Sequence, residues 1–562
     1  MAAQALSLSV NDTASQLSEA LQEELYNWPE SSDTYFIPNN KVDDLVDIEH
    51  VRAVLEAIHS SLSGPRLDDL SHTICSKAKK LFALLLMSNK IQILMELLDE
   101  SITDLDLPFS KILLDKSKPS STLYRLGRRS HDTTCTHIGN DRRCYDYCSI
   151  KTFVNQRSIR DKAEVRTLCS LQWSLLAPVF RNTGGKIKHY DLQYNIILPY
   201  IKDDDGSKGK IKYGGFSQVR GVKIHPTHQK LLLCPNDVNP VIAIKSLNNP
   251  DRTLFKRESE MLSDLTSSRH PNLVNLLATY THKNKDHLMF PYADCNLREY
   301  WQAIPSPHWN KPVAVWAIKQ MRGLVDATCV IHNFQPTHPL EPALPSPEVT
   351  QEKPFVKRLR VTEEKYGRHG DLKPENILCT KNLEDGSMDL QITDLGLGKF
   401  HGLDSRSISR PTDASPTYAS PEIELDRPVS RMYDIWSMGC IFLELITWLM
   451  EGRKGLEIFQ KRRFEFLNPN VGDDTYYTIK RTGDSKHAVL RPSVSSWIAG
   501  LRQSPRCSGM ITDVLDLVQE RMLKGGASER LCAHCLNAKF AFVLDRAMTD
   551  TGYLLQPFNQ IS

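Results

Sequence analysis

The octapeptide HGDLKPEN at residues 369–376 limits the fold of this chain more than any other part of its sequence. It places a carboxylate, Asp371, five positions before an amide, Asn376, and it places Lys373 between them. The apolar pair Ile377-Leu378 that follows is typical of the start of a buried strand. The sequence therefore predicts a tight loop that leads into a strand and holds three polar side chains close together.

A second acidic residue follows the next predicted strand. The segment LQIT reads as a strand and ends at Asp394 of a DLG tripeptide, eighteen residues after Asn376. A carboxylate beside a glycine is a hard oxygen ligand on a backbone that can bend sharply. Phosphoryl transfer needs a carboxylate to orient the attacking hydroxyl and oxygen ligands to hold Mg²⁺ against the phosphates. Asp371, Asn376 and Asp394 are candidates for these roles, and Lys373 can neutralise charge on the transferring group.

These two segments resemble the catalytic loop and the metal-binding loop of eukaryotic protein kinases. The resemblance implies that Asp371, Lys373 and Asn376 are catalytic and that Asn376 and Asp394 hold Mg²⁺. It also implies ATP as the phosphoryl donor and a protein as the substrate. Lys373 after the aspartate favours serine or threonine as the acceptor.

The nucleotide-binding signatures of this family occur upstream, in the family's order. The segment IAIK, with Ala243 and Lys245, resembles the strand whose lysine grips the α- and β-phosphates. Glu258 resembles the helix glutamate that pairs with this lysine. Glu260 is its rival, but Glu258 stands seven residues before Leu265, which matches the family's spacing.

Two further segments complete the implied ATP site. LMFPYA at residues 288–293 resembles the hinge, with Phe290 as the gatekeeper and Ala293 as the backbone partner of adenine. KYGGFSQV at residues 212–219 resembles the glycine-rich loop and supplies Gly214, Gly215 and Val219. This loop departs from the family, because Lys212 and Ser217 stand where glycines are usual. The backbone of Lys212 has fewer accessible conformations than that of a glycine.

Downstream, the tripeptide Ser420–Glu422 resembles the A-P-E that closes the activation segment, and Arg530 is a candidate partner for Glu422. The segment DIWSMG resembles the start of a buried helix whose aspartate, Asp434, holds the catalytic loop. Gly370 replaces the arginine of H-R-D, which binds the activation-segment phosphate in many kinases. We therefore expect a non-RD kinase that phosphorylation of Ser405, Ser407, Ser409 or Thr412 does not switch by that route.

The predicted fold class is α+β: a two-lobed protein-kinase-like fold, with a small β-rich lobe and a large helical lobe, after a mainly helical N-terminal region. We expect helices in residues 1–116, a linker and lead-in segment at 117–193, and the kinase domain at 194–555. Six prolines mark an insertion at about 334–365, because such a density excludes helices and central strands. The insertion and the helical N-terminus resemble a divergent group of predicted kinases from filamentous fungi.

Composition indicates an intracellular protein, cytoplasmic or nuclear. A net charge of +3 gives no indication of a nucleic-acid partner, and the most apolar stretch, Leu81–Met87, is too short to span a membrane. The thirteen cysteines fit reduced thiols better than disulfides. The cluster Cys135, His137, Cys144 and Cys148 matches no common zinc module, and the CxxC at Cys532–Cys535 stands alone, so we expect both to be structural.

A second function stays open at this stage. The altered glycine-rich loop is compatible with a pseudokinase or an ATP-binding scaffold that acts through a protein partner of the N-terminal helices. A small-molecule kinase of the aminoglycoside type shares the two lobes, but Ser420–Glu422 and the helix that begins at Asp434 belong to kinases with protein substrates. No catalytic role has lost its residue, which favours the active protein kinase.

Overall fold

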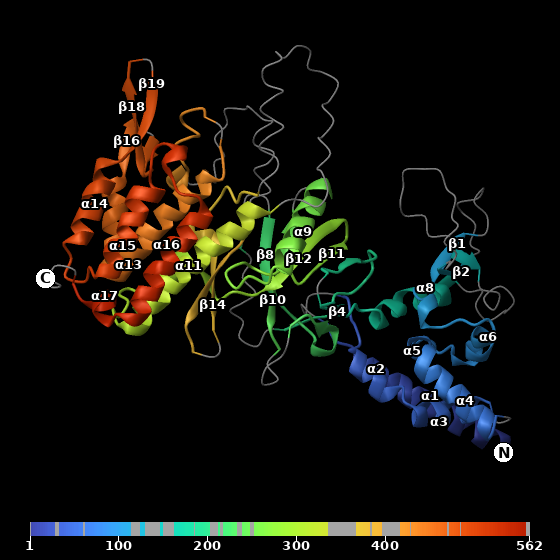
Figure 1. Ribbon diagram of the computed structural model, residues 1–562. Helices are drawn as coiled ribbons and strands as arrows, with labels where there is room; N and C mark the ends of the chain where they lie inside the picture. The colour runs from blue at the N-terminus through green and yellow to red at the C-terminus, as the bar shows by residue number, and fades with distance from the viewer. Residues whose placement is uncertain are drawn as a thin grey trace, which may run out of the picture.

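The computed structural model describes residues 2–27, 33–59, 62–113, 124–129, 147–149, 162–184, 186–202, 212–213, 217–232, 239–247, 252–334, 367–382, 385–395, 416–427, 429–468, 471–483 and 485–557. Three bodies follow one another in a row: an N-terminal helical region, a small lobe built on a sheet, and a large helical lobe (Figure 1). Each has its own apolar core. The predicted α+β class with a small β-rich and a large helical lobe is confirmed.

The N-terminal region is a set of helices around one apolar core. Its elements are α1 (Ala2–Glu23), α2 (Asn39–Leu45), α3 (Ile48–Ile58), α4 (Pro65–Lys77), α5 (Lys79–Met87), η1 (Ile91–Ile93), α6 (Leu94–Asp99) and η2 (Asp104–Asp106). In α3 the apolar residues Val51, Val54 and Leu55 stand at i, i+3 and i+4, a spacing that predicts a buried helix face, and all three are 0% exposed. The stretch Leu81–Met87 is buried along its whole length in α5 and forms the centre of this core.

The predicted linker contains regular structure. The strands β1 (Ser110–Leu113), β2 (Tyr124–Arg129) and β3 (Tyr147–Ser149) form an antiparallel sheet. The sequence of β2, YRLGRR, contains only two apolar residues, Tyr124 and Leu126, which are too few for an alternating pattern to predict a strand. The apolar run LCSLQWSLLAPVF at residues 168–180 resembles a helix in sequence. The structure has instead α8 (Lys162–Leu171) followed by η4 (Gln172–Leu175), and both pack into the N-terminal core.

The small lobe is a seven-stranded sheet with the strand order β5-β11-β12-β10-β8-β6, in which β7 also pairs with β8. Its elements are β5 (His189–Asp191), β6 (Tyr200–Ile201), β7 (Lys212–Tyr213), β8 (Ser217–Ile224), β10 (Val241–Leu247), α9 (Arg252–Ser267), β11 (Ala278–His282) and β12 (Lys285–Pro291), with β4 (Phe180–Arg181), η5 (Pro226–His228) and β9 (Gln229–Lys230) beside the sheet. The runs at 218–224 and 241–247, rich in Val and Ile, have the composition of strands and form β8 and β10. The run NIILPYI at 195–201 has a similar composition, but only its last two residues form a strand, β6, because Pro199 has no N–H to donate to a neighbouring strand.

The large lobe is mainly helical and carries short strands at its edges. Its elements are β13 (Cys295–Asn296), α10 (Leu297–Ala303), α11 (Lys311–Asn333), η7 (Pro374–Asn376), β14 (Ile377–Lys381), β15 (Met388–Ile392), η9 (Pro416–Tyr418), α13 (Met432–Arg463), β16 (Glu465–Asn468), β17 (Val471–Asp473), β18 (Tyr477–Thr482), β19 (Ser485–Leu490), α14 (Pro492–Arg502), α15 (Gly509–Leu517), η10 (Val518–Met522), η11 (Ala527–Glu529), α16 (Ala533–Thr549) and α17 (Thr551–Leu555). The predicted insertion begins where α11 ends, and its residues 335–365 lie outside the described residues.

Helix α13 forms the centre of the large lobe. It is the one described helix long and apolar enough to cross a membrane, and 94% of its most apolar window is buried inside the protein, as in a core helix. The helix bends at Gly452, whose φ is 67°. A Cβ atom at this position would lie 2.4 Å from the carbonyl oxygen of Pro305, so only glycine fits here without a shift of the backbone.

Backbone hydrogen bonds join the segment that follows α9 in the small lobe to β15 of the large lobe. Ile392 donates its N–H to the Asn272 carbonyl at 2.8 Å, and Val274 donates to the Ile392 carbonyl at 3.0 Å. The side chain of Asn272 donates to the Leu390 carbonyl at 2.7 Å. The end of β15, where Asp394 follows, is therefore held near the small lobe.

The contact between the N-terminal region and the small lobe contains a buried histidine that makes it sensitive to acid. His228 accepts a hydrogen bond from the Asn39 N–H at its Nε2 (3.1 Å), so its Nδ1, 3.1 Å from the Pro178 carbonyl, carries the proton. Burial, together with the neighbouring His225 and Lys80, lowers the pKa of His228 to about 4. The ring is therefore neutral in the folded protein.

We predict that the protein loses stability as the pH falls from about 6.5 to about 4, because the unfolded chain binds a proton at His228 that the folded chain excludes. The full effect of this group is about 3 kcal/mol. His228→Gln keeps an acceptor and a donor but does not titrate. The decrease in melting temperature from pH 7 to pH 5 should therefore be smaller for this variant than for the wild type. An equal fall in both proteins would contradict the assignment.

Candidate active site

One buried carboxylate holds the backbone of the octapeptide loop in place. Asp434, in the first turn of α13, accepts hydrogen bonds from the backbone N–H groups of His369 and Gly370, both at 2.8 Å, and its Oδ2 lies 2.9 Å from Nε2 of His332. Burial alone raises the pKa of Asp434, but the hydrogen bonds and the nearby histidines outweigh burial and hold the pKa below its ordinary value. Asp434 is therefore an anion that fixes the loop backbone.

The three polar side chains of the loop lie together, as the octapeptide predicts. Nζ of Lys373 is 3.1 Å from Oδ2 of Asp371. Nδ2 of Asn376 donates to the Asp371 carbonyl at 2.8 Å and to its Oδ2 at 3.2 Å. Because the amide nitrogen of Asn376 faces Asp371, its Oδ1, the atom that can ligate a cation, is directed away from Asp371.

A lysine from the small lobe connects two carboxylates. Nζ of Lys245 in β10 lies 3.0 Å from Oε1 of Glu258 in α9 and 2.9 Å from Oδ1 of Asp394. The rival glutamate Glu260 is instead 3.9 Å from Lys256 on the surface of α9. The structure thus brings Glu258 to Lys245 and joins both to the loop after β15.

The charges of this cluster stabilise one another. Burial lowers the pKa of Lys245, but Glu258 and Asp394 outweigh burial and raise the pKa above its ordinary value. The field of Lys245 lowers the pKa of Asp394 against its own burial. Lysine and aspartate are both charged at neutral pH as a result. The backbone of Asp394 has a φ of 59°, a sparsely populated conformation for a residue other than glycine that is common at functional sites.

The strands β8, β10 and β12 bring the remaining predicted nucleotide-binding residues next to one another. Ala243 pairs with Phe290 in the ladder between β10 and β12, and Lys245 pairs with Val219 of β8. Phe290 is 9% exposed, and Ala293 follows the end of β12. Gly214, Gly215 and Gly396 lie outside the described residues.

The segment that follows residue 415 is tied to the large lobe by a buried ion pair. Nη1 of Arg530 lies 2.8 Å from Oε1 of Glu422, the partner expected from the sequence. Tyr418 donates its hydroxyl to Glu444 of α13 at 2.7 Å. Glu444 also lies 3.3 Å from Arg463. These last contacts were not predictable from the sequence, because Glu444 lies in an otherwise apolar stretch of α13 that shows no partner.

Gly370 occupies a position where a side chain would be strained. Its φ is 75°, and a Cβ atom there would meet only Nε of Arg368, at 3.5 Å. Space is therefore available, but an arginine here would be strained, because L residues rarely adopt this backbone conformation. The serines and the threonine considered as phosphorylation sites lie outside the described residues.

The donor set around the loop fits Mg²⁺ and not a softer metal. Asn376 and Asp394 offer oxygen atoms, and Mg²⁺ is usually bound by one or two carboxylates together with substrate phosphates. Within the described ranges, no group of three or more His, Cys, Asp and Glu side chains is arranged to hold a metal ion by itself. Cys532 and Cys535 are free thiols at the start of α16. The cluster around Cys135 lies outside the described residues, apart from the backbone of Cys148 in β3.

Comparison with known proteins gives a family for the large lobe. Residues 363–535 match the model of the protein kinase domain. This range contains Asp371, Asn376, Asp394 and Asp434, whereas Lys245 and Glu258 lie before it.

Curated relatives are similar to parts of the chain. The chain is 29% identical over 169 residues to serine/threonine-protein kinase 33 of Mus musculus, which is 27% of this chain and 34% of the relative. It is 38% identical over 96 residues to 3-phosphoinositide-dependent protein kinase 1 of Rattus norvegicus, which is 16% of each chain. It is 28% identical over 221 residues to cyclin-dependent kinase-like 4 of Homo sapiens, which is 37% of this chain and 44% of the relative. The matches therefore span less than half the length of these relatives.

Proposed function

Because this chain belongs to the protein kinase superfamily, we propose that it is an active protein serine/threonine kinase, which transfers the γ-phosphoryl group of ATP to a hydroxyl of a protein substrate with Mg²⁺. One observation carries the proposal. Lys245 contacts both Glu258 and Asp394, at 3.0 and 2.9 Å, so the lysine, the helix glutamate and the metal-binding aspartate are already assembled. Kinases require this arrangement for transfer.

Each side chain has a role that follows from its position. Asp371 accepts the hydrogen bond of the substrate hydroxyl and aims it at the phosphorus. Lys373, 3.1 Å from Asp371, neutralises charge on the transferring group. Lys245 binds phosphate oxygens, and Glu258 keeps it in place. Mg²⁺, held through Asn376 and Asp394, supplies positive charge against the phosphates.

In this proposal the hinge and the strands β8, β10 and β12 hold the base of the nucleotide. Ala243, Val219 and Phe290 line the adenine pocket, and the backbone of Ala293 bonds the adenine edge. Gly214 and Gly215 cover the phosphates. Serine or threonine as the acceptor rests on Lys373 and on the names of the serine/threonine-kinase relatives.

We further infer that the active arrangement does not need a phosphate on the segment before Ser420. Gly370 offers no guanidinium to bind such a phosphate. An intracellular location and a protein partner for the N-terminal helices stay predictions.

The test is a transfer assay with γ-labelled ATP, Mg²⁺ and a generic protein substrate. We predict that Asp371→Ala lowers kcat by a factor of about 10³, because the attacking hydroxyl loses its acceptor. Binding of Mg·ATP should stay within about twofold of the wild type, since Asp371 faces the substrate.

Two other outcomes would contradict the proposal. Transfer that survives Asp371→Ala would remove this residue from the chemistry. Binding of Mg·ATP by the wild type without any transfer would favour the scaffold, in which the chain binds nucleotide and acts through its N-terminal region. Glu375→Ala is the matched control, because Glu375 lies on the same loop but its carboxylate contacts Arg298 at 3.1 Å instead of the site.

A further inference from the structure

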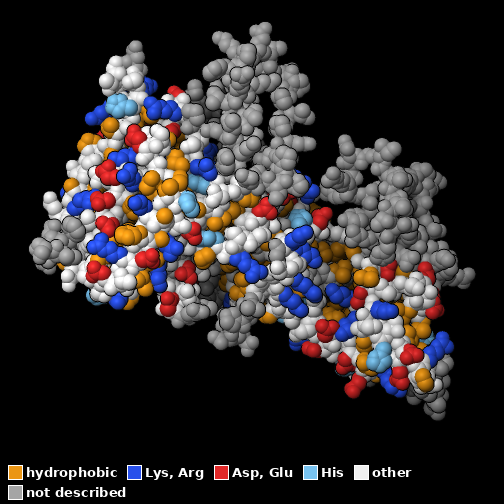
Figure 2. Space-filling view, viewed as in Figure 1, with side chains coloured by type: hydrophobic (Ala, Val, Ile, Leu, Met, Phe, Trp, Pro, Cys, Tyr) orange, Lys and Arg blue, Asp and Glu red, His pale blue; other side chains and the backbone are white. Residues whose placement is uncertain are grey.

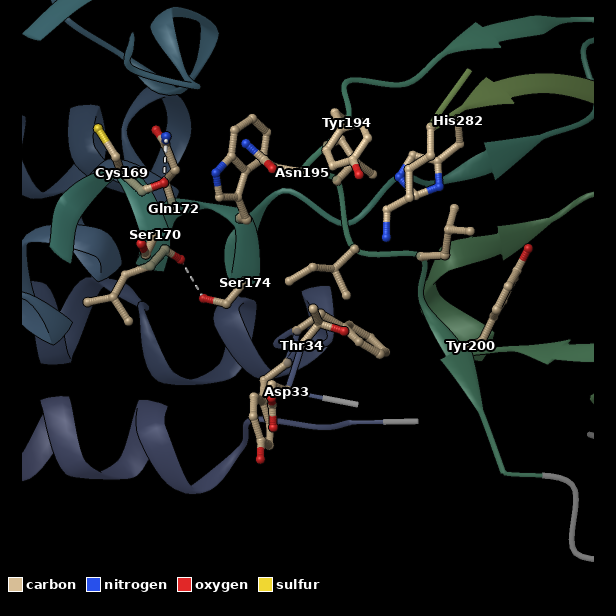
Figure 3. A pocket seen from close by; sticks show the side chains of 18 of the residues that line it. Asp33, Thr34, Cys169, Ser170, Gln172, Ser174, Tyr194, Asn195, Tyr200 and His282 are labelled. Carbon is tan, nitrogen blue, oxygen red and sulfur yellow. Dashed lines mark hydrogen bonds between the residues drawn. The ribbon is translucent and has the colours of Figure 1, made fainter. Parts of the chain in front are cut away.

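A cavity of about 1020 Å³ lies between the N-terminal region and the small-lobe sheet. Figure 3 shows its two sides: Thr34 and Gln172 come from the N-terminal region, and Tyr200 and His282 come from the sheet. Its volume is at the upper end of the range for small-molecule sites, about 300–1,000 Å³. No function derived so far uses this cavity.

The cavity opens on the face of the sheet opposite to the nucleotide site. Its wall includes His287 of β12, whose Nδ1 lies 2.9 Å from Oγ of Ser246 in β10. Neighbouring residues of a strand point to opposite faces, so Ser246 faces the cavity and Lys245 faces the nucleotide site. A ligand in the cavity would therefore occupy a site of its own.

Basic side chains gather on the sheet side of the cavity. Arg220 of β8, Lys285 and His287 of β12, and His282 of β11 all line it, and the described wall contains a single acid, Asp33. Among the described residues neither Arg220 nor Lys285 forms an ion pair with a carboxylate. On the face seen in Figure 2, lysine and arginine side chains gather over the small lobe beside an apolar area at the junction.

Aromatic side chains hold Arg220 and His287 in position. The Arg220 guanidinium lies 5.1 Å from the centre of the Tyr200 ring, and the hydroxyl of Tyr200 is 2.8 Å from that of Tyr280. The His287 ring stacks on Tyr280 with 4.3 Å between ring centres. Burial, together with the nearby Arg220, His282 and Lys285, lowers the pKa of His287 to about 4.

The remaining walls are apolar and aromatic. Phe36 and Phe109 are buried at the N-terminal side, and Trp173 of η4 lines the same side. At the rim Tyr35 is 44% and Tyr194 is 66% exposed, although large aromatic side chains are usually buried. Exposed aromatic groups next to cations that have no carboxylate partner suit a ligand with an apolar body and a negative group.

We propose that this cavity binds a small amphipathic organic anion, with its carboxylate, phosphate or sulfonate group at Arg220 and Lys285 and its apolar body against Trp173 and Tyr194. The ligand contacts both the N-terminal region and the small lobe, so it joins the two. The proposal does not depend on the phosphotransfer activity.

The test uses the full chain titrated with 1-anilinonaphthalene-8-sulfonate, an aromatic anion whose fluorescence rises in apolar sites. One dye should bind per chain, and saturating Mg·ATP should not displace it. Arg220→Gln and Lys285→Gln should each weaken binding about tenfold, because a charged hydrogen bond is lost. Tyr194→Ala should weaken it about threefold through lost aromatic contact. Lys256→Gln, a matched loss of an exposed lysine on α9, should bind as the wild type does.

The proposal would be overturned by unchanged dye binding in Lys285→Gln, by displacement of the dye by Mg·ATP, or by equal binding of the uncharged N-phenyl-1-naphthylamine. Lys285 is exposed, so its variant keeps the test valid even if Arg220→Gln does not fold. Competition with palmitate and with phenyl phosphate then separates an aliphatic from an aromatic body. Failure of both to displace the dye would also overturn the proposal.

Discussion

Replacing Asp394 with asparagine should lower Mg²⁺-dependent phosphoryl transfer by a factor of about 10³. The substitution keeps the size of the side chain but removes a charge that Lys245 contacts at 2.9 Å and that a cation would need. Transfer rates measured across a range of Mg²⁺ concentrations check this expectation. Rates that recover fully at high Mg²⁺ would show only weakened metal affinity, whereas a lasting loss of kcat indicates a role in the transition state.

A matched control separates this effect from a general loss of charge. Asp385 lies in the turn between β14 and β15, and its Oδ1 accepts a hydrogen bond from the Ser387 hydroxyl at 2.7 Å. Asp385→Asn removes one carboxylate close in sequence to Asp394 but away from Lys245. It should change neither kcat nor the Mg²⁺ dependence. A comparable loss in both variants would contradict the assignment of Asp394.

Replacing Asp434 with alanine should destabilise the large lobe by about 3–5 kcal/mol. The carboxylate is 0% exposed, so its removal leaves the buried N–H groups of His369 and Gly370 and the ring of His332 without their acceptor. The melting temperature should fall by about 10 °C. Calorimetry measures this fall. The variant should also lose phosphoryl transfer at temperatures where it is still folded, because its octapeptide loop is no longer fixed.

Asp516→Ala is the control for this substitution. Asp516 is 56% exposed and pairs with Arg502 at 2.6 Å on the surface of the same lobe. An exposed pair of this kind contributes at most about 1 kcal/mol. Equal melting temperatures of Asp434→Ala and the wild type would contradict the role of Asp434 as the support of the loop.

Local sequence was sufficient to predict the octapeptide cluster. Asp371 and Asn376 are five residues apart on one loop, so their proximity follows from chain connectivity. Lys245 and Asp394 are 149 residues apart, and their contact at 2.9 Å was predictable only from the order of motifs in the family. Periodicity identifies the faces of strands and helices but does not say which distant faces meet.

The N-terminal half shows the limit of such predictions. The apolar stripe of α3 was visible because a helix buries every third or fourth residue. β2 was missed, because YRLGRR has no sustained apolar alternation and its pairing with β1 is visible only in the structure. The packing of Leu168 and Leu175 into the N-terminal core was also missed, since an apolar face gives no information about its partner. The cavity beside Trp173 follows from that packing.

The most direct test of the account is the rate of γ-phosphoryl transfer by phosphatase-treated protein that lacks Ser405, Ser407, Ser409 and Thr412 through alanine substitutions. We predict transfer from Mg·ATP to serine or threonine of a protein substrate at the rate of the unsubstituted chain, with phosphoserine or phosphothreonine identified in the product. Tight binding of Mg·ATP without any transfer, by both proteins, would contradict an active kinase.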